Sequence, residues 1–431
     1  MQVLNKALTR FAVVTLLPMC FIACKREHEG MEGKPGTIVI ENVLQGKPLV
    51  ESGMFKGSGA AAPVILPGEA VSFSFSAAKG QRVTFSAMYG WSNDLFFAPG
   101  NPGIALYNEA GDPVNGDVSS VIRLWDNGTR INQAPGMSVM HPGAVESKNI
   151  REVNGVDDQG NTYLPASALL KATLHYDGNS YFTLTLKNTS GGTANETPVS
   201  PGVWAVSYIA GTDLLDPQPL YQSGSTSYAG LTKLAETGDN AEIYTVVQGK
   251  TGIFTPLSPV LVVIYRGENP LFKVGESDRM KGLKKLAQTG NPDELAASLQ
   301  TQPGIKKVYI LADPENTVLL PSVNGAPGGK VSQAISLAKD DRIAIATMYG
   351  FSNDWFFSTA DNGIAWNQKG DVSEQIRLYD NGTAMDQFPG AGNGQQGGMM
   401  ITEKKLIIEV PNPNTFTTLP PVKQIIKVTL N

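Results

Sequence analysis

The chain has 431 residues with 34 Lys and Arg against 39 Asp and Glu, so its formal net charge is −5. A nucleic-acid binder normally has a basic face, and we therefore expect no nucleic-acid partner. Three histidines and two cysteines, both cysteines before residue 25, are too few for a His/Cys zinc site or a disulfide framework. The 46 glycines and 28 prolines indicate many tight turns between short strands in a folded chain of more than one domain.

The first residues have the pattern of an export signal. Lys6 and Arg10 form a short basic region, and an apolar run extends from Phe11 to Ile22. A run of about a dozen apolar residues is too short for a permanent membrane span but suits a cleaved signal peptide. We therefore expect residues 1–23 to be a signal peptide and the mature protein to be exported.

The apolar run ends in Phe21-Ile22-Ala23-Cys24, which resembles the lipobox of bacterial lipoproteins, where a cysteine after a small residue is lipidated. Cys20 is a poorer choice because Met19 is large for the position before the cleaved bond. The alternative is an ordinary signal peptide that ends in an incidental cysteine. We expect lipidation at Cys24, anchoring to the bacterial outer membrane, and a flexible tether over the charged, glycine-rich residues 24–36.

One unit occurs twice in the chain. Residues 88–97 (MYGWSNDLFF) and 348–357 (MYGFSNDWFF) are identical at eight of ten positions, and residues 122–129 (IRLWDNGT) match residues 376–383 (IRLYDNGT). The offset falls from 260 to 254 between these two pairs, so the second unit lacks six residues in what we expect to be a surface loop. Repeated segments in one order indicate a tandem duplication.

Short segments of both units alternate apolar and polar residues, as in Val71-Phe73-Phe75 and Ile343-Ile345-Thr347. This period of two, bounded by Gly, Pro, Asn and Asp, is typical of antiparallel strands with one buried face. The predicted fold class is mainly β, with two tandem antiparallel β-sandwiches. The first is expected over residues 37–176 and the second over residues 180–431, separated by the turn Asp177-Gly178-Asn179.

Two strands define this predicted boundary, because 37–43 (TIVIENV) and 181–186 (YFTLTL) are expected to open the first and second domains. The second domain also contains helical patterns. Met280, Leu283, Leu286 and Ala287 recur at helical spacing, and Asn291-Pro292-Asp293-Glu294 is typical of a helix start. Residues 230–238 (GLTKLAETG) resemble this stretch, so we expect a duplicated helical insert over residues 200–303.

Several motifs recur in both units in the same order: SND followed by Leu or Trp and FF, then GIA, GDVS, Trp or Tyr with DNGT, and Pro-Gly. In these motifs, over roughly residues 34–431, the chain resembles the spondin N-terminal domain of F-spondin, mindin and many bacterial secreted or lipid-anchored proteins. The resemblance implies a C2-like β-sandwich used in adhesion and ligand recognition. It also implies a calcium ion at one end of the sandwich and no enzymatic activity.

The calcium ligands implied by this resemblance are the Asp of an S-x-D motif and the two Asp of a D-x-G-T-D motif. They map to Asp94, Asp126 and Arg130 in the first unit and to Asp354, Asp380 and Ala384 in the second. The third carboxylate is therefore missing in both units, which weakens a calcium site. The alternative is that these Asp-Asn-Gly segments are ordinary turns, in which Asp and Asn accept backbone hydrogen bonds.

The second unit is the better candidate for calcium. Asp386 follows the neutral Ala384 by two residues, and in an extended segment its side chain points to the same face about 7 Å farther along. The first unit has Asn132 at that place, and the charge of Arg130 at the third ligand position opposes a cation. We expect any calcium to bind through Asp354, Asp380 and Asp386.

Aromatic residues cluster around the same loops, and large apolar side chains are mostly buried. We expect Phe96, Phe97 and Trp125 in the core, and Trp91 and Trp355 to be the most exposed of the group. Exposed aromatics beside polar loops can stack on sugar rings or contact a protein partner.

These observations favour a lipid-anchored envelope protein that binds a protein or glycan ligand through the loops of two spondin-like domains, without catalysis. One alternative is a structural or accessory subunit of an envelope complex. A less favoured alternative is a glycan hydrolase that uses Asp94 and Asp126 as its acid pair.

Overall fold

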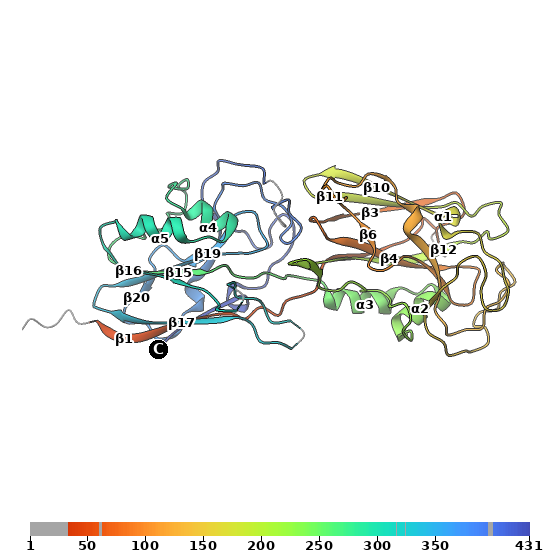
Figure 1. Ribbon diagram of the computed structural model, residues 1–431, viewed down its shortest axis with the longest axis horizontal. Helices are drawn as coiled ribbons and strands as arrows, with labels where there is room; N and C mark the ends of the chain where they lie inside the picture. Colours follow the sequence, from red (N-terminus) through yellow and green to blue (C-terminus); the bar gives the residue numbers. More distant parts are fainter. Residues whose placement is uncertain (1–32, 60–62, 316, 324, 395–399) are drawn as a thin grey trace, which may run out of the picture.

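The computed structural model describes residues 33–59, 63–315, 317–323, 325–394 and 400–431. They form two β-rich lobes that lie end to end along the long axis of the molecule (Figure 1). We call residues 49–252 the N-lobe, and residues 34–44 together with residues 253–431 the C-lobe. The fold is mainly β and its sheets are antiparallel, which confirms the predicted fold class.

The N-lobe contains two sheets that enclose one hydrophobic core. Its strands are β2 (Leu49–Phe55), β3 (Ala70–Ser76), β4 (Arg82–Tyr89), β5 (Leu95–Pro99), β6 (Ile104–Ala105), β7 (Gly116–Asp117), β8 (Ile122–Asp126), β9 (Arg151–Glu152), β10 (Leu170–Gly178), β11 (Tyr181–Asn188) and β12 (Val199–Ser207), with a small hairpin of β13 (Ile209–Ala210) and β14 (Asp213–Leu214). The larger sheet has the order β2-β12-β4-β5-β8-β9, with β6 beside β4. The smaller sheet has the order β3-β11-β10-β7.

The C-lobe repeats this arrangement with a second core. Its strands are β1 (Lys34–Asn42), β15 (Val260–Tyr265), β16 (Ile305–Leu311), β17 (Lys330–Leu337), β18 (Arg342–Met348), β19 (Trp355–Thr359), β20 (Ile364–Ala365), β21 (Gly370–Asp371), β22 (Ile376–Asp380), β23 (Ile408–Glu409) and β24 (Ile426–Leu430). The larger sheet has the order β16-β15-β18-β19-β22-β23, with β20 beside β18. The smaller sheet has the order β17-β1-β24-β21.

Comparison of the two sheet orders shows that the lobes are related by a permutation of the chain. β1 lies between β17 and β24, just as β11 lies between β3 and β10. Asn42 and Asn188, at the ends of these two strands, each donate from Nδ2 to two backbone carbonyls, those of Thr255 and Leu319 and those of Thr197 and Ile65 respectively. The whole N-lobe is therefore inserted between β1 and β15 of the C-lobe.

The predicted domain boundary at residues 176–180 is wrong. β10 and β11 form one hairpin of the N-lobe, joined by a turn in which Gly178 and Asn179 have φ values of 95° and 52°. The strand expected to open the first domain, at 37–43, belongs instead to the C-lobe. Alternation of apolar and polar residues identifies a strand with one buried face, but it does not identify the sheet that the strand joins.

The predicted helical insert over residues 200–303 also divides between the lobes. α2 (Ala229–Thr237) and α3 (Ala241–Lys250) pack on the larger sheet of the N-lobe, and α4 (Leu283–Thr289) and α5 (Asp293–Gln300) pack on that of the C-lobe (Figure 1). The sequence predicted α2, α4 and α5 but gave no specific signal for α3, and it assigned the stretch of α2 to the wrong domain. The short α1 (Ala166–Leu169) precedes β10.

Candidate metal centre

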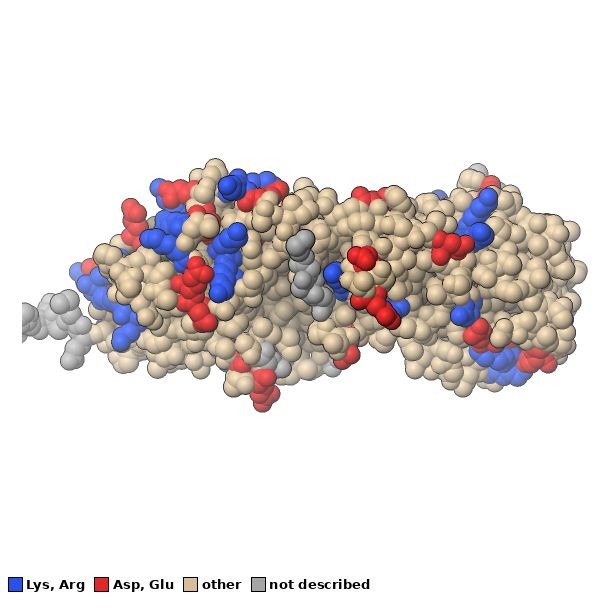
Figure 2. All heavy atoms as spheres, turned by 45° about the horizontal axis from the view of Figure 1, so that its top comes forward, with Lys and Arg blue, Asp and Glu red and all other residues tan. Residues whose placement is uncertain are grey.

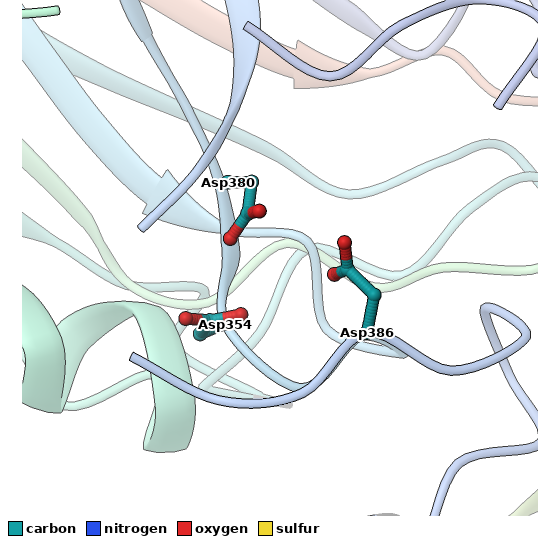
Figure 3. Close-up of side chains that lie close together, drawn as sticks. All are labelled: Asp354, Asp380 and Asp386. Carbon is teal, nitrogen blue, oxygen red and sulfur yellow. The ribbon is translucent and has the colours of Figure 1, made fainter. Parts of the chain in front are cut away.

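Three aspartates of the C-lobe converge where β19 and β22 meet (Figure 3). Asp354 directly precedes β19, Asp380 ends β22, and Asp386 lies in the loop that follows. The pairing of Trp355 with Asp380 brings the first two acids together. One carboxylate oxygen from each of the three lies within 4.8 Å of the others. The structure therefore brings together the three acids that the sequence singled out.

The hydrogen bonds of Asp354 orient its carboxylate. Its Oδ2 accepts hydrogen bonds from the backbone N–H of Thr383 at 2.6 Å, from the Thr383 hydroxyl at 2.9 Å and from the backbone N–H of Ala384 at 2.9 Å. Its Oδ1 is buried and has no hydrogen-bond partner among the described residues. A buried oxygen without a partner is unfavourable, so a bound cation would satisfy it.

The other two carboxylates are each held by one strong contact. Asp380 Oδ1 accepts a hydrogen bond from the backbone N–H of Gly382 at 2.7 Å, and Asp386 Oδ1 accepts one from Trp355 Nε1 at 2.6 Å. Gly382 has a φ of 68°, a conformation that glycine adopts without strain. These contacts orient the two carboxylates, which are drawn in Figure 3.

Burial raises the pKa of Asp354, Asp380 and Asp386 to about 6 in each case. The negative charge of Asp354 raises the pKa of Asp380 further, and that of Asp380 does the same for Asp386. Lys405 lowers the pKa of both, but its ammonium group is paired with Glu403 at 2.5 Å. Three crowded carboxylates supply only oxygen ligands, and this donor set suits a hard cation such as calcium.

A pocket of about 360 Å³ opens beside this cluster. Asp380 and Asp386 line one part of it, and Trp355, Ile408 and Phe416 supply apolar wall. Asp380 and Asp386 are therefore reachable from a cavity of the size that small ligands occupy.

The equivalent acids of the N-lobe are arranged differently. Asp94 Oδ2 accepts the same three hydrogen bonds, from the backbone N–H and hydroxyl of Thr129 and from the backbone N–H of Arg130. Asp126 Oδ2, however, accepts hydrogen bonds from Asn132 Nδ2 at 2.6 Å and from the guanidinium of Arg151 at 2.5 Å. Protein groups therefore occupy the side of Asp126 that corresponds to the cluster in the C-lobe.

Arg130 does not have the role that its position suggested. Its guanidinium turns away from the acids, pairs with Glu236 at 2.8 Å and donates to the Gly143 carbonyl at 3.1 Å. The cation beside Asp126 is Arg151, which the sequence reasoning missed. A signal for it exists, because residues 149–153 (NIREV) align with residues 406–410 (LIIEV) and place Ile408 at the position of Arg151.

The aromatic side chains near these loops are mainly core residues. Phe96, Phe97 and Trp125 are buried as expected. The expectation for Trp355 is wrong, since its side chain is 2 % exposed and its indole N–H is used by Asp386. Trp91 is partly exposed beside the N-lobe core. The number of exposed aromatics is therefore lower than the loop sequences indicated.

Comparison with known proteins yields no matching family model and no matching curated protein. The expected signal peptide and Cys24 lie outside the described residues. None of the described helices is long and apolar enough to cross a membrane. On the face drawn in Figure 2, acidic and basic side chains are interspersed and neither sign forms a continuous patch.

Proposed function

We propose that the protein is a lipid-anchored recognition protein of the bacterial cell envelope, whose C-lobe binds calcium and uses it to hold a glycan. The observation that carries this proposal is the cluster of Asp354, Asp380 and Asp386, with the unpartnered Asp354 Oδ1, beside an accessible pocket. The resemblance to spondin N-terminal domains supports the same reading. Anchoring rests on the lipobox at Cys24.

The ion would leave coordination positions for a ligand. Calcium takes about six to eight oxygen ligands, more than three carboxylates supply in most arrangements. Neighbouring hydroxyls of a sugar can provide two of the remaining oxygens. Phe416, which lines the pocket and is 36 % exposed, offers an aromatic surface for the apolar face of a sugar ring.

The acid pair of the alternative hydrolase is poorly placed for catalysis. Asp94 and Asp126 are both 0 % exposed, and Arg151 already neutralises Asp126. A general acid must come within hydrogen-bond reach of its substrate. This favours recognition over hydrolysis for these residues.

Calorimetry with the mature chain tests the metal site. We expect one calcium per chain, loss of binding in Asp380→Ala, and retained binding in the matched N-lobe variant Asp126→Ala. A glycan array probed with and without calcium then tests the ligand. Calcium-dependent glycan binding without turnover supports the proposal, whereas binding to matrix proteins alone, hydrolysis, or no ligand under either condition contradicts it.

A further inference from the structure

The loop that carries Asp386 continues directly into the contact between the two lobes. Gln387 Oε1 accepts hydrogen bonds from Asn353 Nδ2 at 3.0 Å and from the Asn393 backbone N–H at 2.7 Å. These bonds close residues 387–393 into a compact loop and tie it to the residue that precedes Asp354. Asp386 is therefore connected to this loop along the chain, and Asp354 is connected to it through its neighbour Asn353.

The opposite side of the loop of residues 387–393 contacts the N-lobe. Gly390 O accepts a hydrogen bond from Gln81 Nε2 at 2.7 Å, and Asn393 Oδ1 accepts one from the hydroxyl of Ser180. Ala391 is fully buried and belongs to the hydrophobic core cluster of the N-lobe. Gly390 has a φ of 93°, and a Cβ there would lie 2.1 Å from the ring of Tyr208. The fit between the loop and the N-lobe is therefore close.

A second connection runs from Asp354 to the same contact. Phe351, three residues before Asp354, stacks on Tyr208 of the N-lobe with ring centroids 5.9 Å apart. It also contacts the ring of Phe254 in a tilted arrangement at 5.5 Å. Phe388 packs against the N-lobe core on one side and contacts Phe416, which lines the pocket beside the acids, on the other. The acids, the pocket and the lobe contact are thus joined by a few adjacent side chains.

The corresponding loop of the N-lobe provides an internal comparison. Residues 133–137 (QAPGM) occupy the positions of residues 387–391 (QFPGA), and Gly136 N–H donates to Trp91 O as Gly390 N–H donates to Phe351 O. Met137, at the position of the fully buried Ala391, is 81 % exposed. The described N-lobe loop therefore has the same local backbone hydrogen bond, but its residue equivalent to Ala391 is exposed instead of packing against the other lobe.

We propose that a cation at Asp354, Asp380 and Asp386 strengthens the docking of the two lobes, so that calcium regulates how rigidly they are held together. This inference rests on the calcium site proposed above. Without a cation, the three carboxylates repel one another, and Asp386 lies in a loop outside the strands. Neutralising the cluster fixes Asp386 and, through the 387–393 loop, the surface that contacts Gln81, Ser180 and Tyr208.

Linkage makes this proposal measurable in two directions. If calcium favours the docked state, then docking must favour calcium by the same factor. Variants of the contact that touch none of the acids should therefore weaken calcium binding.

Hydrogen exchange of the full chain with and without calcium tests the first direction. We expect calcium to slow exchange in segments 76–82 and 207–210 of the N-lobe, although neither contains a predicted ligand. Segment 133–141, the free loop of the same lobe, serves as the control and should not change. Protection confined to segments 353–356 and 380–386 would overturn the coupling and leave the calcium site intact.

Calorimetry of contact variants tests the second direction. Gln81→Ala and Asn393→Ala should each lower calcium affinity about 5-fold or more, whereas Gln333→Ala, on the edge strand β17, should leave it unchanged. Equal affinity in the wild type and both contact variants overturns the coupling alone. No calcium binding by the wild-type chain overturns both the coupling and the calcium site.

Discussion

Arg151 donates a hydrogen bond to the carboxylate of Asp126 from the directly opposed position on the neighbouring strand. In the C-lobe the same register places Ile408 opposite Asp380. Asn132 adds a second donor to Asp126 where the C-lobe has Asp386. The N-lobe thus neutralises Asp126 with its own side chain Arg151, whereas the C-lobe brings together three carboxylates that an external cation can neutralise.

This difference predicts that two substitutions transfer the metal site. Arg151→Ile with Asn132→Asp gives the N-lobe the same cluster as the C-lobe, because Asp94 and Asp126 are already in place. We expect calorimetry to show two calcium ions per chain in place of one. Arg151→Ile alone should destabilise the N-lobe by on the order of 1–3 kcal/mol, since it leaves Asp126 buried without its cation. A double variant that still binds one calcium would show that other N-lobe features exclude the ion.

The raised pKa values predict how the stability of the calcium-free protein depends on pH. Each acid of the cluster has a pKa of about 6 in the folded chain, above its ordinary value of 3.8. Between these values the folded state binds more protons than the unfolded state, so stability falls as the pH rises from about 4 to about 7. The calcium ion that we propose would bind the ionised acids and should restore stability at the upper end of this range.

Asp386→Asn isolates this effect, because the amide has nearly the same shape and does not ionise. We expect the variant to be more stable than the wild type at pH 7.5 without calcium, and the difference to be several-fold smaller at pH 4.5, where the folded Asp386 is protonated. Denaturant unfolding at the two pH values measures this directly. An equal difference at both pH values would mean that the substitution acts through packing and not through charge.

Much of the candidate site was predictable, because the spondin-like motifs pointed to Asp354 and Asp380 and the spacing of Asp386 from Ala384 pointed to the third acid. Arg151 was harder to find because it lies 25 residues from Asp126 and reaches it only through the pairing of β8 with β9. The domain boundary failed for a related reason. β1 pairs with strands about 290 to 390 residues away in the chain, and its alternating pattern does not predict which strands these are.

The permutation predicts which fragments fold. Residues 46–252 contain every strand of the N-lobe and should unfold cooperatively as an isolated chain. Residues 253–431 lack β1, whose Ile38 and Ile40 are fully buried in the C-lobe core. We expect this fragment to be poorly folded until a peptide of residues 33–44 is added, as followed by circular dichroism and thermal melting. Independent folding of residues 180–431 with a cooperative transition would contradict this assignment.

Lipid anchoring is predicted at Cys24. The wild-type protein should fractionate with membranes, and its N-terminal peptide should carry the lipid mass on Cys24. Cys24→Ala should abolish both, whereas Cys20→Ala should change neither, because Ala23 and not Met19 suits the position before the cleaved bond. Wild-type protein that is soluble and free of lipid would show that the motif is incidental.

Trp355 is predicted to report calcium binding by its fluorescence. Its side chain is buried and its indole N–H donates to Asp386, so a change in the charge of that carboxylate changes the field on the ring. We expect calcium to alter the emission of the wild-type protein and Trp355→Phe to remove the response. Trp125→Phe, which removes a buried indole of the N-lobe, is the control and should leave the response intact. Because Trp355→Phe also frees Asp386 from its only side-chain donor among the described residues, calorimetry should show calcium affinity altered but not abolished. A response that persists in Trp355→Phe and disappears in Trp125→Phe would place the calcium site in the N-lobe.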